Sequence, residues 1–132
     1  MTELIPTVLQ DGHVALEPLS LDHVAGLEAA AADGELWNLR VTYVPPPDAM
    51  QAYVETALAM QAAGDSLPFA VRDKRDGALV GSTRYYGFDA ETPRLLIGHT
   101  WYARSRQRSP VNTACKLLLI GYAFERLGCA AV

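Results

Sequence analysis

Residues 104–112 read Arg-Ser-Arg-Gln-Arg-Ser-Pro-Val-Asn, and the apolar stretch after them predicts a buried helix that ends near residue 127. Ser109 suits the N-cap of that helix, Pro110 suits its first position, and Gly128 stands where a C-cap glycine belongs. A helix N-terminus carries unpaired N–H groups and a partial positive charge, to which the arginines of the loop add full charges. Such a turn can hold a diphosphate, which accepts several donors at once. The same residues also fit an ordinary solvated loop before a well-capped helix, and the local sequence favours neither interpretation.

Three strand patterns precede the basic loop. Residues 67–72, 78–86 and 95–102 are rich in apolar and aromatic side chains. Asp76-Gly77 is a strong signal for a two-residue hairpin turn between the first two patterns. A polar segment over residues 89–93 separates the second pattern from the third. Together they predict an antiparallel meander.

The N-terminal half predicts one strand and two helices. Residues 13–18 predict the strand, and residues 20–32 predict a helix that begins at a serine N-cap. Residues 48–64 open on a capping-box pattern and predict the second helix. Residues 35–44 fit a short strand or an ordered loop equally well. With a further strand opening at residues 129–132, this order of elements indicates a mixed α/β protein (α+β mixed).

Composition excludes several classes of protein. The 132 residues, 50% hydrophobic and 20% charged, fit one soluble domain, and the net charge of −4 argues against a general binder of nucleic acid or anionic membranes. The sequence shows no apolar run that could span a membrane and no secretory signal. Cys115 and Cys129 have no metal-ligand spacing, and His13, His23 and His99 are far apart, so no metal site is predicted. A cytoplasmic protein with reduced cysteines is the simplest interpretation.

The order of elements and the loop at residues 107–112 resemble the GNAT acetyltransferase superfamily, whose acetyl-CoA loop follows the pattern Q/R-x-x-G-x-G/A. More narrowly, the last quarter of the chain looks like the branch related to ribosomal-protein N-terminal acetyltransferases. That resemblance rests on residues 97–102, 107–108, 111–113, 116–119, 123–125 and 127–129. It implies a GNAT-like acyl-CoA N-acyltransferase fold, with a central, mostly antiparallel sheet and flanking helices. Residues 1–132 would form a single, partial domain that lacks the C-terminal strands.

The resemblance also implies which residues bind acetyl-CoA. The pyrophosphate would be held by a set of residues around the start of the final helix: Gln107, Arg108, Ser109, Val111, Asn112 and Thr113. Backbone groups of Trp101, Tyr102 and Ala103 would pair with the pantetheine arm. Pro110 stands in place of the first glycine of the pattern and has no N–H, so one phosphate donor is missing.

Acetyl transfer to an amine needs a base for the amine and a donor that polarises the thioester carbonyl. In the family that donor is a backbone N–H, which falls near Thr100 to Trp101, and the base is often a carboxylate on the same strand. Here residues 95–98 are apolar, so His99 and Glu91 remain as candidate bases, although each also fits a structural or solvated role. Residues 84–86 either line the acceptor cleft or belong to the core.

Two functions follow from these expectations. The first is an N-acetyltransferase that moves an acetyl group from acetyl-CoA to a primary amine, either a protein N-terminus or a small amine. The second is a catalytically incomplete CoA-binding or dimerisation module that retains the fold. The chain ends at Val132 within an apparent strand, which we interpret as a truncation. Apolar surface exposed there would be covered by a second copy, giving a homodimer through this edge.

Overall fold

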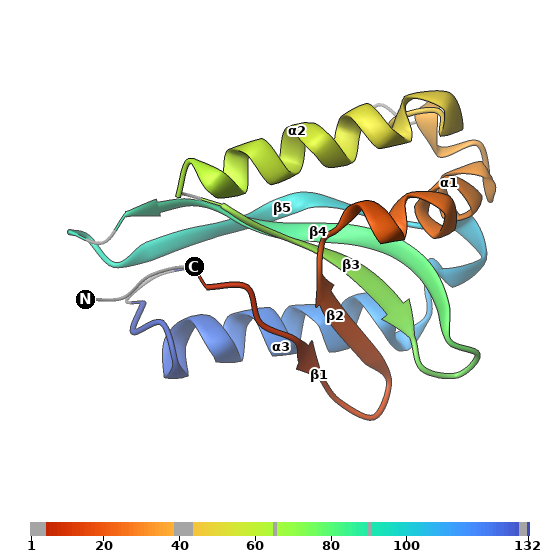
Figure 1. Ribbon diagram of the computed structural model, residues 1–132. Helices are drawn as coiled ribbons and strands as arrows, with labels where there is room; N and C mark the ends of the chain where they lie inside the picture. The colour runs from red at the N-terminus through yellow and green to blue at the C-terminus, as the bar shows by residue number, and fades with distance from the viewer. Residues whose placement is uncertain (1–4, 39–43, 65, 90, 130–131) are drawn as a thin grey trace.

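The computed structural model describes residues 5–38, 44–64, 66–89, 91–129 and 132. A central sheet separates two layers of helix (Figure 1). Helices α1 (Val24–Ala32) and α2 (Met50–Ala62) cover one face, and α3 (Pro110–Glu125) covers the other. This is the flanked, mixed α/β arrangement that the order of elements predicts.

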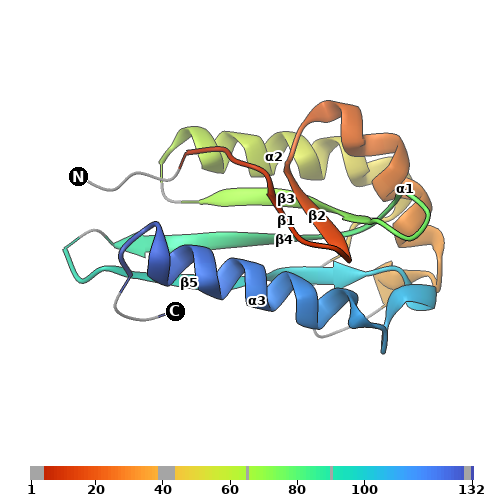
Figure 2. The same ribbon diagram turned by 90° about the horizontal axis from the view of Figure 1, so that it is seen from below.

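All neighbouring strands of the sheet are antiparallel, in the order β1-β2-β3-β4-β5 (Figure 2). The bounds are β1 Leu9–Gln10, β2 Val14–Pro18, β3 Leu67–Asp73, β4 Ala78–Asp89 and β5 Arg94–Tyr102. The predicted meander of β3, β4 and β5 is therefore confirmed. The sequence did not predict β1, because two residues are too few to show an alternating pattern.

Several element boundaries differ from the prediction. One-turn 3-10 segments precede each helix, at Leu21–His23, Pro47–Ala49 and Arg104–Arg106, and another covers Leu36–Asn38. Asp48 consequently lies inside a 3-10 turn, and Ala49 takes the N-cap position of α2 without a side-chain bond, so the capping box is wrong. The hairpin after β3 is longer than the predicted two residues, because Asp73 pairs with Ala78.

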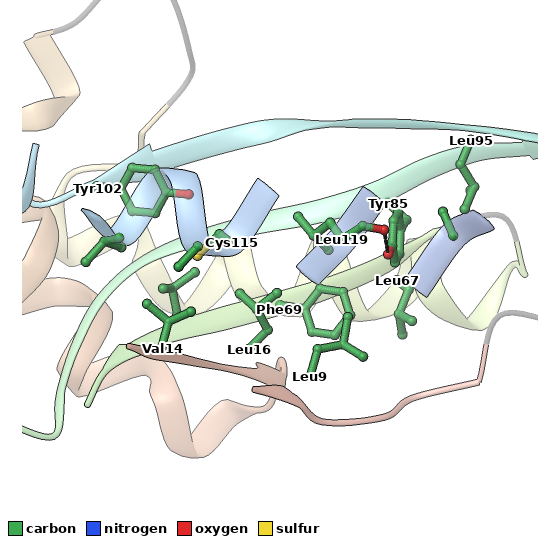
Figure 3. Packing of buried hydrophobic residues seen from close by; sticks show 14 of the residues in the cluster. Leu9, Val14, Leu16, Leu67, Phe69, Tyr85, Leu95, Tyr102, Cys115 and Leu119 are labelled. Carbon is green, nitrogen blue, oxygen red and sulfur yellow. Dashed lines mark hydrogen bonds between the residues drawn. The ribbon is translucent and has the colours of Figure 1, made fainter. Parts of the chain in front are cut away.

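Two hydrophobic cores stabilise the layers. The core between the sheet and α3 includes Phe69, Tyr85 and Leu119, and the Tyr85 hydroxyl donates a hydrogen bond to the Leu119 carbonyl (Figure 3). The core on the opposite face lies under α1 and α2 and includes Trp101 and Leu27. Tyr85 is thus a core residue, as one of the two interpretations of residues 84–86 predicts.

The end of the chain departs from two predictions. We expected α3 to be largely buried, yet Leu117, Ile120 and Phe124 are 68%, 40% and 46% exposed. Cys129 and Val132 lie in no strand, and the other two residues of the strand predicted over 129–132 fall outside the described residues. Residues 39–43, part of the segment 35–44 that fits a strand or a loop, also fall outside them. Within the described ranges, no helix is both long and apolar enough to cross a membrane.

Candidate functional site

A β-bulge interrupts the pairing of β5 with β4. Gly98 pairs with Arg84 and Trp101 pairs with Ser82, so His99 and Thr100 together lie opposite the single residue Thr83. His99 has a φ of 50°, in the left-handed region that non-glycine residues rarely adopt. A bulge leaves one backbone unit outside the ladder, and bulges are often found beside functional sites. The predicted position of the carbonyl-polarising N–H, near Thr100 to Trp101, coincides with this bulge.

A pocket of ≈ 350 Å³ lies between α2 and the sheet, next to the bulge. Tyr53, Thr56 and Met60 of α2 line one side, and Arg84 of β4 and His99 of β5 line the other. The remaining lining residues are alanines, one at the N-cap of α2 and two within the helix. The pocket is therefore mostly apolar with a few converging polar groups, which is the usual composition of a small-molecule site.

The surroundings of His99 favour its neutral form. His99 is an exposed residue of β5, yet partial desolvation lowers the pKa of its imidazole below the ordinary 6.5, and the nearby charge of Arg84 lowers this pKa further. The ring of Tyr86 meets the imidazole edge-on, with the ring centroids 5.1 Å apart. Gly98 leaves room for that tyrosine, because a Cβ at position 98 would come within 2.8 Å of its ring. The imidazole thus has one supporting ring contact and, being neutral, can accept a proton at neutral pH.

The N-terminus of α3 is partly closed by its own cap. The Ser109 hydroxyl accepts the Val111 N–H at 3.3 Å and donates to the Arg106 carbonyl at 2.5 Å. Pro110 has no N–H, so of the four amides that a helix start leaves open only those of Ser109 and Asn112 remain for a ligand. The predicted contribution of the Val111 backbone to phosphate binding therefore competes with the cap.

The basic loop presents its arginines unequally. The Arg106 guanidinium donates to Asp73 at 2.7 Å and to Asp76 at 2.6 Å, so its charge is matched within the protein. Arg108 is exposed and has a φ of 62°. The side chains of Asn112 and Thr113, one helical turn further on, are exposed as well. Arg108 is therefore better placed than Arg106 to meet a phosphate in solution.

The end of β5 offers fewer free backbone groups than we expected. The Ala103 N–H donates to the Val80 carbonyl at 2.7 Å, and the Tyr102 carbonyl accepts the Gln107 side-chain amide at 3.1 Å. The Trp101 and Tyr102 side chains are buried on opposite faces of the sheet. Because β5 is the edge strand of the described sheet, its outer backbone groups remain the ones that could pair with an extended ligand.

The second candidate base lies elsewhere. Glu91 is exposed in the turn between β4 and β5, where its N–H donates to the Asp89 carboxylate at 3.0 Å. From the start of β5 at Arg94 to His99 the strand rises about 16 Å, and Glu91 is not among the residues that line the pocket. The structure therefore brings together His99, the bulge and the pocket, and leaves Glu91 at the far end of the strand.

Two further kinds of site find no support in the described residues. No group of three or more His, Cys, Asp or Glu side chains lies close enough to hold a metal ion there. Burial raises the pKa of Cys115 to about 11, so this thiol is protonated at neutral pH and is not poised as a nucleophile.

Two features of this region could not be predicted from the sequence. Arg84 was expected only as a candidate lining residue, and the apolar pocket that surrounds it was not expected. Asp73 was not singled out, although its contact with Arg106 joins segments 33 residues apart. Neither feature leaves a local signal in the sequence, because both depend on strand pairing across the sheet.

Comparison with known proteins gives a consistent result. Residues 13–132 match the family model described as an acetyltransferase (GNAT) domain. No curated protein sequence is significantly similar to the chain.

Among solved structures, the chain is similar to a GCN5-related N-acetyltransferase from Brucella melitensis, with a TM-score of 0.80 and 25% identity over 98% of this chain and 61% of that one. It is also similar to a proposed acetyltransferase from T. thermophilus, with a TM-score of 0.78 and 25% identity over 96% of this chain and 64% of that one. The chain thus spans less than two thirds of the length of either protein.

A third similar structure is an acetyltransferase from Salmonella typhimurium that modifies the N-terminal serine of the 50S ribosomal subunit protein L7/L12. Its TM-score is 0.75, and its 13% identity covers 92% of this chain and 70% of that one. At that identity the likeness concerns the fold alone.

Proposed function

The chain belongs to the acetyltransferase (GNAT) family, and on that premise we propose that it transfers an acetyl group from acetyl-CoA to a primary amine. The observation that carries this proposal is the bulge of β5, which sets His99 and an unpaired stretch of backbone beside the pocket under α2. A base, a backbone donor and a cavity are the parts that aminolysis of a thioester needs.

The coenzyme would lie between the start of α3 and the edge of β5. Its diphosphate would accept hydrogen bonds from the Ser109 and Asn112 amides, with Arg108 and Thr113 adding side-chain donors. Gln107 would act indirectly, because its side chain holds the Tyr102 carbonyl and so fixes the loop against the strand. The pantetheine arm would then run along β5, where Tyr102 and His99 are three positions, about 10 Å of strand, apart.

The reaction would proceed by attack of the neutral amine on the thioester carbonyl. A new C–N bond forms, the C–S bond breaks, and the amine loses one proton while the departing thiolate gains one. His99 would take the proton from the amine, and a backbone N–H at Thr100 or Trp101 would stabilise the charge on the carbonyl oxygen. Glu91 could serve only through a change in the β4–β5 turn, since it is remote from the pocket.

The acceptor would be a protein N-terminus or a small amine. The Salmonella typhimurium enzyme of the same fold, which acts on an N-terminal serine, supports the first class. The second candidate function, CoA binding without catalysis, is favoured by the two features that weaken the phosphate turn: the self-capping of Ser109 and the matched charge of Arg106.

Thermal unfolding with and without acetyl-CoA tests the proposal. A ligand that binds only the folded protein stabilises it by RT ln(1 + [L]/Kd), about 2.7 kcal/mol at a hundredfold excess over Kd. We expect this stabilisation in the wild type, and a loss of about tenfold or more in affinity in Arg108→Glu. Arg94→Glu, which reverses an exposed charge at the other end of β5, is the matched control and should bind normally.

The outcome separates the two functions. Binding followed by release of free CoA in the presence of a peptide or amine panel supports the transferase. Binding without turnover supports the CoA-binding module. No shift in melting temperature at millimolar acetyl-CoA would contradict both.

A further inference from the structure

Arg84 is a cation buried in the wall of the pocket. Its side chain crosses from β4 towards α2, and the residue is only 4% exposed. The Tyr53 hydroxyl accepts a hydrogen bond from one terminal nitrogen at 3.3 Å, and the Met60 sulfur lies 3.8 Å from the other. The guanidinium carbon lies 5.7 Å from the centre of the Tyr53 ring. These are long or weak contacts, and the Nε atom is buried with no hydrogen-bond partner among the described residues.

The charge of Arg84 is not balanced as the other inward arginines are. Arg72 donates to the carboxylate of Glu17 at 2.7 Å, and Arg106 donates to that of Asp73 at the same distance. Among the described residues Arg84 makes no ion pair, and none of the residues that line its pocket is acidic. A guanidinium stays charged at any accessible pH, so burial cannot neutralise it. A buried, unpaired charge is costly, and an anion that enters the pocket would remove that cost.

We propose that Arg84 binds a carboxylate of the acceptor, so that the substrate is a primary amine that carries a carboxylate group close to the amine. The claim that the bound molecule is the acceptor rests on the proposed function. The carboxylate would lie against Arg84, and the amine would point to His99, which lines the same pocket. The planar fork of an arginine matches both oxygens of a carboxylate and so fixes its orientation.

The rest of the pocket favours a small and partly apolar molecule. Its volume of ≈ 350 Å³ is near the lower end of the usual range for ligand sites, and alanines with Met60 form much of its wall. Two sources share the required chemistry. One is a free amino carboxylic acid, and the other is the N-terminal residue of a peptide that begins with an acidic side chain.

Binding is measured first without acetyl-CoA, so that the arginine site is tested independently of transfer. The probes are ω-amino acids of three to six carbons, such as 5-aminopentanoate, each paired with its amide, in which the amine is unchanged and the carboxylate is gone. Peptides that begin with Asp are paired in the same way with peptides that begin with Asn. We expect at least one carboxylate to raise the melting temperature of the wild type and its amide partner to have no effect.

Two variants locate the effect. Arg84→Met removes the charge and should abolish the shift, while leaving the unliganded protein at least as stable, because an unpaired buried cation is replaced by an apolar chain. Met60→Glu keeps Arg84 and places a carboxylate within reach of it, so it should raise the melting temperature of the free protein and block the probes. Arg94→Met, an exposed arginine on β5, is the control and should behave as the wild type.

Turnover then tests the acceptor. With acetyl-CoA, we expect kcat/KM for the effective carboxylate to exceed that for its amide by about 10- to 100-fold, the value of one hydrogen bond to a charged group. Arg84→Met should abolish this preference. Equal response to acid and amide, or an acid response retained in both Arg84→Met and Met60→Glu, would overturn the proposal. If the protein binds the carboxylate but no acetyl-CoA, the proposed function fails and the assignment of the carboxylate as acceptor fails with it. The carboxylate site at Arg84 would still stand.

Discussion

His99 combines an unusual backbone conformation with a reactive side chain. A positive φ in a non-glycine residue costs on the order of 1 kcal/mol and persists only where the surroundings enforce it. Here the bulge in β5 enforces it, and the Tyr86 ring supports the imidazole from one side. The sequence placed His99 on the strand, but a bulge changes which face each following residue takes, and this cannot be seen in an apolar run such as residues 95–98.

Replacing His99 by Gln tests its role as the base. We expect kcat to fall by about 10²- to 10⁴-fold, because proton transfer from the amine is lost, while acetyl-CoA binding is kept. In the wild type the pKa of His99 is lowered, so the fraction of neutral imidazole falls only when the pH drops below the ordinary value of 6.5. The acidic limb of the kcat/KM profile should therefore lie below pH 6.5. The control is His13→Gln, which replaces an exposed histidine in the β1–β2 turn. An unchanged profile in His99→Gln would contradict the assignment.

At the scale of elements, an ion cluster joins the basic loop to the β3–β4 hairpin. Asp73, at the end of β3, is 1% exposed and accepts hydrogen bonds from Arg75 beside it and from Arg106 in the loop. These bonds hold the pKa of the Asp73 carboxyl well below its usual range, with Arg75 the main cause. The loop before α3 is thus fixed to the sheet. The Arg106 guanidinium and the Arg106 carbonyl, which accepts a hydrogen bond from Ser109, therefore stabilise the fold.

Asp73→Asn should release this connection. We expect the free energy of unfolding to fall by about 2 kcal/mol at pH 7, which is the range of one hydrogen bond to a charged group. The bond to Arg75 adds little to this value, because that arginine is exposed to solvent. Because the folded-state pKa lies below the unfolded value of 3.8, the stabilisation is complete above that pH and is lost as the pH falls beneath it. Urea unfolding of wild type and variant at about pH 7 and about pH 3 measures both effects. A difference that grows as the pH falls would contradict this account.

The sequence predicted the long elements well and the short ones poorly. Strands β3 to β5 and the three helices each contain enough residues for their hydrophobic period to be visible, so their existence and order followed from the sequence. The 3-10 turn at Pro47–Ala49 and the two-residue strand β1 depend on contacts made after folding, and local propensity does not report them. The site shows the same division: the start of α3 was predicted from its caps, whereas the surroundings of Arg84 were not.

At the scale of the whole molecule, the sheet is covered on both faces, yet the outer side of α3 stays apolar. Leu117, Ile120 and Phe124 recur at helical spacing and form an exposed stripe along this helix. Their companions Leu119 and Ala123 point the other way and are buried in the core against the sheet. The helix therefore has more apolar surface than one face of a sheet can bury, which explains why its composition predicted a largely buried helix.

The exposed stripe should make this chain self-associate in solution. We expect the 132-residue protein to bind a hydrophobic dye and to self-associate with rising concentration, because contiguous apolar patches on soluble proteins mark contact or aggregation surfaces. The double variant Leu117→Lys/Phe124→Lys should remove most of the dye signal and the self-association, measured by fluorescence and analytical ultracentrifugation.

The free energy of unfolding of this double variant should change by no more than about 0.5 kcal/mol, as is usual for exposed positions. Leu119→Lys, on the buried side of the same helix, should instead destabilise the fold by several times that amount, since it forces a charge into the core. If the wild type is monomeric at high concentration and binds no dye, the outer face of α3 is not an association surface, and the homodimer that the sequence predicted through the C-terminal edge loses support as well.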